Sequence, residues 1–194
     1  MLRWLILCSA VAVLAVPVRA QVAPGAKKQS GDSFLMYGPD HLFAVRAPLD
    51  WTVDAATAQQ LGLHAVMYPR GSSWREAPAT MYTNFVHKDK DLPTLEKIIA
   101  DDIDGYRKES PNIVIEEAEP LPIADGKKRV SVKAFHGDKG GNYEAVAYID
   151  ESKVVILIVL TARSQKDFEL NWPVFKEMVH SYRFISGTVT LPKP

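Results

Sequence analysis

Seven consecutive aliphatic residues, Val154 to Leu160, constrain the fold more than any other feature of this sequence. A strand that faces solvent on one side alternates apolar and polar residues, whereas this run is apolar at every position. Such a strand is buried on both faces, so we place it centrally in a sheet with helices above and below it. The run is also far shorter than the roughly 20 residues that a membrane-spanning helix needs.

Other strand-like segments surround this run. Three precede it directly and are separated by short turns: Ile113–Ala118, Lys127–Phe135 and Tyr143–Ile149. Connections this short join antiparallel neighbours, because a parallel crossover needs about a dozen residues or more. Further strands are expected earlier in the chain, at Phe34–Tyr37, Leu42–Ala47, Trp51–Val53, His64–Tyr68 and Ala79–Val86. The sequence therefore predicts a mostly antiparallel sheet.

Three segments have helical patterns. Leu92–Lys108 is the clearest, because its apolar residues fall on one helical stripe. Asp54 is placed to cap a short helix over Ala55–Leu61. A last helical region follows the aliphatic run, with Pro173 expected in a first turn after Asn171. We therefore predict an α+β fold, a three-layer α/β/α sandwich with a mostly antiparallel central sheet.

The N-terminus has the pattern of a cleaved secretory signal peptide over residues 1–20. Arg3 supplies a positive start, Trp4 to Pro17 an apolar stretch, and Val18-Arg19-Ala20 small residues for cleavage near Ala20. We therefore expect a periplasmic or secreted protein with no membrane span after signal removal. An uncleaved signal that serves as an anchor is the alternative.

The rest of the chain divides into three parts. Residues 21–33 are poor in large apolar side chains and are expected to form a flexible N-terminal lead. Residues 34–185 contain no long Pro/Gly linker and no internal repeat, which favours a single domain. Residues 186–194 carry Gly187, Pro192 and Pro194, which suit an extended C-terminal tail.

Cysteine content and charge exclude several classes of function. The only cysteine, Cys8, lies in the predicted signal peptide, so the mature chain has no disulfide, cysteine nucleophile or thiolate zinc site. Loss of Arg3 and Arg19 with the signal leaves 21 basic against 23 acidic residues, a net charge of about −2. This balance differs from the strongly basic surface of a nucleic-acid-binding protein. We expect no nucleic-acid partner.

Two loops offer candidate metal ligands. His87-Lys88-Asp89 and His136-Gly137-Asp138 each place a carboxylate two residues from an imidazole, after a predicted strand. If the loops met, His87, Asp89, His136 and Asp138 would suit a divalent ion, as a metal-binding protein or a metal-dependent hydrolase. Solvated loops are the alternative. The chain has no Gly-x-Ser-x-Gly or His-Glu-x-x-His motif, and we predict no enzyme activity and no cofactor.

A polar loop, Pro69–Pro78, offers a candidate partner surface. Tyr68, Arg70, Trp74 and Arg75 give it the aromatic and arginine content that protein interfaces favour. Trp74 has polar neighbours in sequence and is exposed unless the loop folds back onto the body. The expected partner is another envelope or secreted protein. A small ligand bound between the sheet and a helical layer remains an alternative.

Two segments resemble the PsbP-like and DcrB-like domain family. The segment Leu42 to Trp51 is similar to the strand, Pro, two residues, Trp signature that opens these domains. The segment Phe175 to Phe184 resembles their terminal helix with its Ser-aromatic-basic-Phe ending. The resemblance covers roughly Phe34 to Ile185, and its motifs are packing motifs.

The resemblance implies an α/β/α sandwich and a non-enzymatic binding or accessory role. The group includes an extrinsic photosystem subunit, a bacterial envelope protein and a Ran-binding nuclear factor, and it brings no shared catalytic residue. One position departs from its pattern, because Asp50 stands before Trp51 where such domains usually carry Gly. We expect this departure to affect the local turn and not the fold.

Overall fold

A computed structural model describes residues 31–189 except 125 and 127–128. The predicted signal peptide, 1–20, its cleavage near Ala20, and the N-terminal lead as far as residue 30 lie outside the described residues. The same holds for the predicted C-terminal tail from residue 190 onward. No helix within the described part of the chain is long and apolar enough to cross a membrane.

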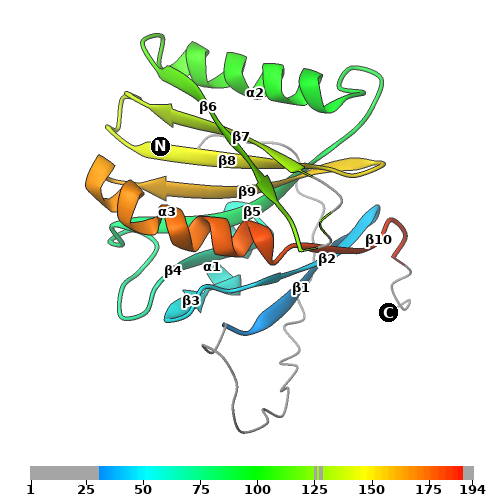
Figure 1. Ribbon diagram of the computed structural model, residues 1–194, viewed down its shortest axis with the longest axis horizontal. Coiled ribbons are helices and arrows are strands. Elements are labelled where there is room, and N and C mark those ends of the chain that lie inside the picture. Colours follow the sequence, from blue (N-terminus) through cyan, green and yellow to red (C-terminus); the bar gives the residue numbers. More distant parts are fainter. Residues whose placement is uncertain (1–30, 125, 127–128, 190–194) are drawn as a thin grey trace, which may run out of the picture.

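A seven-stranded antiparallel sheet forms the centre of the fold, in the order β3-β4-β5-β9-β8-β7-β6 (Figure 1). Its strands are β3 (Trp51–Val53), β4 (Ala65–Pro69), β5 (Ala79–His87), β6 (Val114–Pro122), β7 (Arg129–His136), β8 (Tyr143–Asp150) and β9 (Val154–Ala162). The aliphatic run lies in β9, which is the fourth of the seven strands. The predicted central position is confirmed.

The residues of β9 supply two cores alternately. Val154, Ile156 and Ile158 pack into one core on one face of the sheet. Val155 and Val159 pack into a second core on the other face. Successive side chains of a strand point to opposite faces, so an unbroken aliphatic run can serve both cores. This is the physical reason for the run.

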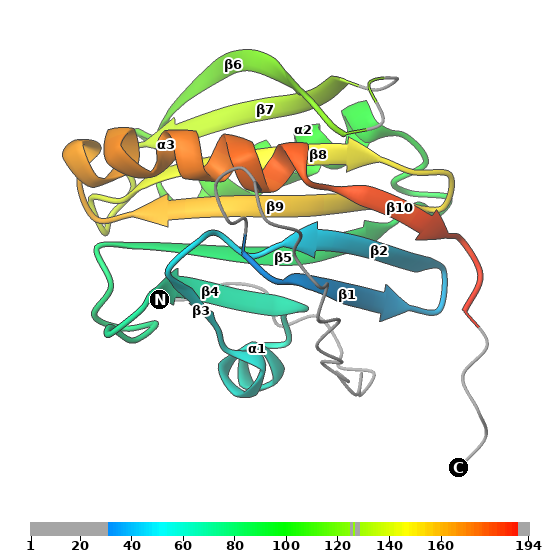
Figure 2. The same cartoon turned by 60° about the horizontal axis from the view of Figure 1, so that its bottom comes forward.

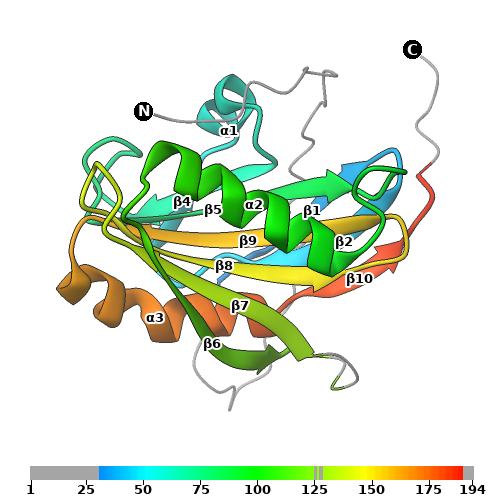
Figure 3. The same ribbon diagram turned by 90° about the horizontal axis from the view of Figure 1, so that it is seen from above.

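Helices cover both faces of the large sheet (Figure 3). Helix α2 (Leu95–Glu109) packs its apolar stripe on one face, and the short helix α1 (Ala55–Leu61) packs beside β4 on that face. Helix α3 (Gln165–His180) packs on the opposite face. The predicted α+β class, a three-layer α/β/α sandwich with a mostly antiparallel sheet, is confirmed.

A second sheet shares the face of α3. It contains β1 (Ser33–Gly38), β2 (His41–Arg46) and β10 (Arg183–Ser186), in the order β1-β2-β10 (Figure 2). Phe43 and Val45 of β2 join the same core as α3 and the large sheet. The sequence predicted the strands at Phe34–Tyr37 and Leu42–Ala47, but not that they belong to a separate sheet.

The helix boundaries correct two expectations. Helix α3 begins at Gln165 with Ser164 as its N-cap, so Pro173 lies inside the helix and not in its first turn. A proline has no N–H, so the helix loses one internal hydrogen bond at that point. Helix α2 begins at Leu95, three residues later than predicted, because the Thr94 hydroxyl caps it. Helix α1 has the predicted bounds, with Asp54 as N-cap.

The turn before Trp51 explains the departure at Asp50. Asp50 has a φ of 61°, the left-handed region that favours glycine. Its carbonyl accepts a hydrogen bond from the N–H of Arg70 at 2.8 Å, which ties the turn to the end of β4. Aspartate is among the non-glycine residues that adopt this conformation most readily. The turn is therefore kept without glycine.

Candidate functional site

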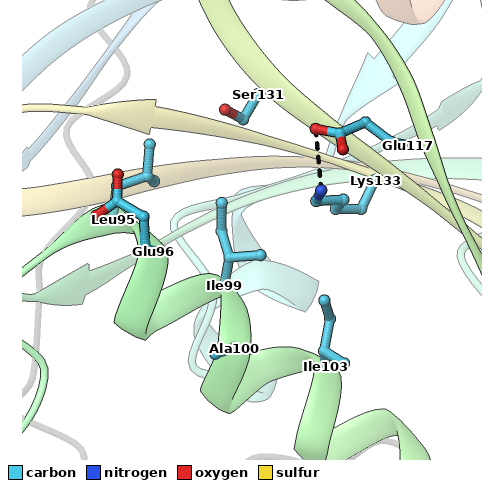
Figure 4. A pocket seen from close by; sticks show the side chains of 8 residues that line it. All are labelled: Leu95, Glu96, Ile99, Ala100, Ile103, Glu117, Ser131 and Lys133. Carbon is cyan, nitrogen blue, oxygen red and sulfur yellow. Dashed lines mark ion pairs between the residues drawn. The ribbon is translucent and has the colours of Figure 1, made fainter.

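A groove of about 320 Å³ runs beside α2, over the outer strands β6 and β7. Figure 4 shows its lining side chains, which come from one edge of the helix and from the two strands: Leu95, Glu96, Ile99, Ala100, Ile103, Glu117, Ser131 and Lys133. Leu95, Ile99 and Ile103 recur every four residues, so they form one row along the helix. The groove thus has an aliphatic wall and a polar wall.

The polar wall is set by strand register. Glu117 of β6 and Lys133 of β7 are direct partners in the antiparallel ladder. Their side chains form an ion pair with Nζ and Oε1 3.0 Å apart. The Lys133 side chain is 17% exposed and that of Glu117 73% exposed, so the carboxylate stands at the rim. The groove therefore combines apolar contact area with a charged rim.

A network of carboxyl and hydroxyl groups lies between α2 and the sheet. The Tyr148 hydroxyl donates to Asp102 of α2 at 2.5 Å. Glu144 of β8 accepts from the hydroxyls of Tyr106 and Thr161, the latter at 2.5 Å. Burial raises the pKa of Asp102 to about 6 and that of Glu144 to about 7. In both cases the hydroxyl donor opposes this shift.

A histidine pair is buried on the opposite face. His41 of β2 and His64, which precedes β4, are 0% and 5% exposed, and their Nε2 atoms lie 3.3 Å apart. Burial is the main cause that lowers the pKa of His41 to about 4 and that of His64 to about 3. Both rings lie against Phe85, at centroid distances of 4.4 Å and 4.7 Å.

No protein-family model and no curated protein matches this chain. Cyanobacterial PsbP (CyanoP) from Synechocystis sp. PCC 6803 superposes with a TM-score of 0.54 at 11% identity, over 85% of this chain and 98% of that one. This chain has a PsbP-like fold.

Two further solved structures are similar over a smaller part of the chain. The Ran-binding protein Mog1p of Saccharomyces cerevisiae gives a TM-score of 0.47 at 11% identity, over 74% of this chain and 90% of that one. A point mutant of Mog1 gives 0.47 at 12% identity, over 74% and 91%. The superposition on PsbP confirms the PsbP part of the predicted resemblance as a fold.

The PsbP-like fold separates the predicted metal ligands. His87 ends β5 opposite Val154, the first residue of β9. His136 ends β7 opposite Tyr143, which in turn pairs with Ala162, the last residue of β9. At about 3.3 Å per residue, the two ends of β9 are roughly 25 Å apart.

The two loops therefore lie at opposite ends of the sheet. His87 and Asp89 cannot share one ion with His136 and Asp138, and the expectation of a single four-ligand site is wrong. No group of three or more His, Cys, Asp or Glu side chains suited to a metal ion occurs within the described residues.

The predicted partner surface is only half exposed. Tyr68 is 9% exposed and its hydroxyl donates to Asp54 at 2.8 Å. Trp74 folds back onto the body and packs edge-on against Tyr82, with ring centroids 6.1 Å apart. Arg70 and Arg75 are exposed. The two aromatic residues thus hold the loop in place, and the two arginines form its outer surface.

Sequence reasoning missed the two half-buried acids and the buried histidine pair. Strand alternation contained a signal for Glu144, because Glu144, Val146 and Tyr148 share one face of β8 and the latter two are buried. Helical spacing contained one for Asp102, which is four residues from Ile98 and from Tyr106 on the apolar stripe. His41 and His64 are 23 residues apart and only the tertiary fold brings them together.

Proposed function

We propose that this chain is a non-enzymatic binding domain that works in the periplasm or as a secreted protein. Its partner is another envelope or secreted protein, and its binding surface is the groove beside α2. One observation carries the proposal: an open groove with an aliphatic wall, from Leu95 to Ile103, faces an ion pair at its rim. Interfaces combine an apolar centre with a polar rim in this way.

The location of the ionisable groups favours binding over catalysis. A general acid or base must reach the reacting atom within hydrogen-bond distance. Asp102 and Glu144, the acids with raised pKa values, are held by hydroxyl donors inside the helix–sheet packing and do not line the groove. Most of the groups that do line it are aliphatic or ion-paired, which suits contact with a partner.

The cellular location rests on the N-terminal sequence. Residues 1–20 have the charge, apolar stretch and small residues of a signal peptide. The likeness to PsbP and the predicted likeness to DcrB-like domains are consistent with an accessory role. The mass of the mature protein tests this part: cleavage near Ala20 gives a chain that begins at Gln21, and a retained signal gives the full 194 residues.

The Pro69–Pro78 loop is a second surface for the same partner. Arg70 and Arg75 are exposed at the outer side of the loop, and arginine is enriched in protein interfaces. Tyr68 and Trp74 contribute by fixing the loop. The predicted partner residues therefore act in two different ways.

Site-specific photo-crosslinking in the native source distinguishes these surfaces. A photoreactive residue is placed at Ala100 in the groove, at Arg75 in the loop, and at Lys176 on the exposed side of α3 as the control. We expect a crosslinked band of the same partner protein from Ala100 and from Arg75, and no such band from Lys176. A band from Arg75 alone would move the interface to the loop. Labelling that is equal at all three positions would contradict both surfaces.

A matched substitution tests the groove directly. Ile99→Asp places a charge in the aliphatic wall, whereas Lys97→Asp places one on an exposed position of the same helix. We expect Ile99→Asp to abolish the crosslink from Ala100 and Lys97→Asp to preserve it. If Ile99→Asp instead abolishes the binding of a small molecule and leaves the crosslinked protein band unchanged, the small-ligand alternative is favoured.

A further inference from the structure

The outer strands of the two sheets are protected to different degrees against pairing with another chain. These strands are β3 and β6 in the large sheet and β1 and β10 in the small one. An edge strand carries N–H and C=O groups that no neighbouring strand uses, and proteins block pairing there with charges, prolines, bulges or short strands. Three of the four edges have such protection.

Strands β6, β3 and β10 are each blocked. Strand β6 carries three glutamates and two prolines, and its pairing with β7 contains a register shift. Strand β3 has only three residues. Strand β10 has four, begins with Arg183, and also shifts register against β2. These three edges are therefore poor templates for another strand.

Strand β1 lacks all of these features. Its six residues contain no charge and no proline, and its register with β2 is unbroken. Figure 2 shows β1 at the outer side of the small sheet. No strand of the described part of the chain pairs with that outer side. Of the four edges, β1 is the one suited to accept another strand.

The register of β1 shows which of its backbone groups point outward. The N–H of Ala47 donates to the carbonyl of Asp32 at 3.0 Å, so these two residues form a hydrogen-bonded pair. Such pairs alternate along an antiparallel ladder. Phe34 therefore bonds toward β2, whereas Ser33 and Leu35 direct their N–H and C=O groups away from it. The side chains of Ser33 and Leu35 are also exposed.

The composition of β1 favours a second copy of this chain as the strand that pairs there. In a symmetric pair each strand meets its own sequence, so a charge on the strand lies close to the same charge of the partner. Strand β6 with its glutamates would repel itself, whereas β1 has no charge to oppose pairing. Antiparallel pairing also brings the two Leu35 side chains to one face, directly or diagonally opposite each other.

From these observations we infer that the chain forms a symmetric dimer in which the β1 strands of two copies pair antiparallel, through the N–H and C=O groups of Ser33 and Leu35. The two small sheets then become one continuous sheet. This dimer goes beyond the proposed function, because the small sheet lies on the α3 face of the fold and the groove lies beside α2. The groove therefore stays accessible in the dimer.

The mass in solution of the full chain, as its source produces it, tests this dimer. Sedimentation equilibrium over a wide range of concentrations should show the mass rise from one chain to two. Leu35→Lys should weaken association by roughly tenfold or more, because like charges replace an apolar pair. Leu170→Lys is the matched control: it makes the same change at a leucine of α3 that is 70% exposed, and it should associate like the wild type.

Mixing two variants separates a loss of pairing from a loss of folding. Leu35→Lys and Leu35→Glu should each associate weakly alone and more tightly when mixed, because opposite charges then lie across the pair. The wild type gives a measurement that needs no variant. Hydrogen exchange of the Leu35 amide should slow as the protein concentration rises, because its N–H becomes hydrogen-bonded in the dimer.

Four results would overturn the dimer. They are the mass of one chain at every concentration, equal association of Leu35→Lys and the wild type, no gain in association on mixing the two variants, and exchange of the Leu35 amide that does not depend on concentration. None of these results concerns the groove, which photo-crosslinking tests separately. Failure of the dimer and failure of the proposed function are thus distinguishable.

Discussion

Two polar clusters, one half-buried and one buried, lie on opposite faces of the same sheet and are built differently. Beneath α2, Asp102 and Glu144 are acceptors, and tyrosine and threonine hydroxyls supply the matching donors. Beneath the small sheet, His41 and His64 contact each other and leave their Nδ1 atoms unpartnered within the described residues. The first cluster is complete without a ligand. The second is not, because its Nδ1 atoms lack a partner among the described residues.

The two clusters also respond to pH with opposite signs. The pKa values of Asp102 and Glu144 are raised from 3.8 and 4.5 to about 6 and 7, so their contribution to stability is lost as pH rises through those values. The pKa values of His41 and His64 are lowered from 6.5 to about 4 and 3, so their contribution is lost as pH falls below 6.5. Between pH 4.5 and pH 6 the effects oppose each other.

The largest expected effect is a strong pH dependence of the free energy of unfolding in variants that lack one acid or one histidine. Glu144→Gln removes one acid with a raised pKa, so between pH 4.5 and 6 the unfolded state binds about one proton more than the folded state. The free energy of unfolding should therefore rise by about 1.4 kcal/mol per pH unit in this range. His64→Gln should give a slope of similar size and opposite sign. Urea unfolding at several pH values measures both.

The wild type is the control for these slopes. Its free energy of unfolding should vary little across the same pH range, because two acids and two histidines compensate. Parallel pH curves for the wild type, Glu144→Gln and His64→Gln would contradict the assignment of opposite signs to the two clusters.

A smaller effect is expected where the histidine pair depends on close packing. Gly38→Ala would bring a Cβ to 2.5 Å from the buried His41 ring, and overpacking of this kind costs about 1–3 kcal/mol. The free energy of unfolding by urea measures the loss. Unchanged stability would mean that His41 has room to move.

The network beneath α2 should respond to loss of a single donor. Tyr148→Phe removes the hydroxyl that donates to Asp102, and loss of such a bond to a carboxylate costs about 1.5–3 kcal/mol, less where Asp102 is protonated. It should also raise the pKa of Asp102, because that hydrogen bond lowers it. Carbon-13 NMR titration of the Asp102 carboxyl follows the shift. Thr161→Val, which removes a donor to Glu144, should leave the pKa of Asp102 nearly unchanged.

The fold was more predictable from sequence than these clusters. The aliphatic run in β9 and the Asp54 cap of α1 are local patterns with one structural solution, and both predictions were confirmed. The error at Pro173 arose because proline favours a first turn, whereas Ser164 and the apolar residues of α3 begin the helix earlier. Propensity is a weak guide when capping and packing act together.

The clusters depend on contacts between distant segments. His41 and His64 meet because β2 lies over the large sheet, and no local sequence pattern indicates that placement. The expected metal site failed for the same reason, since His87 and His136 look alike in sequence but end strands that run in opposite directions along β9. Residue type indicated which side chains could bind a metal ion. The topology of the sheet decided which of them lie close together.

The smallest predicted effect is that of Gly105→Ala, which contrasts directly with that of Gly38→Ala. Gly105 lies inside α2, and a Cβ added there meets nothing within 4 Å. Gly105→Ala should therefore stabilise the protein by up to about 1 kcal/mol, because alanine loses less backbone entropy in a helix. Thermal unfolding measures the gain, and the pKa of Asp102 should not move. Stabilisation at Gly105 together with destabilisation at Gly38 would show that the same substitution reports free space beside one cluster and close packing beside the other.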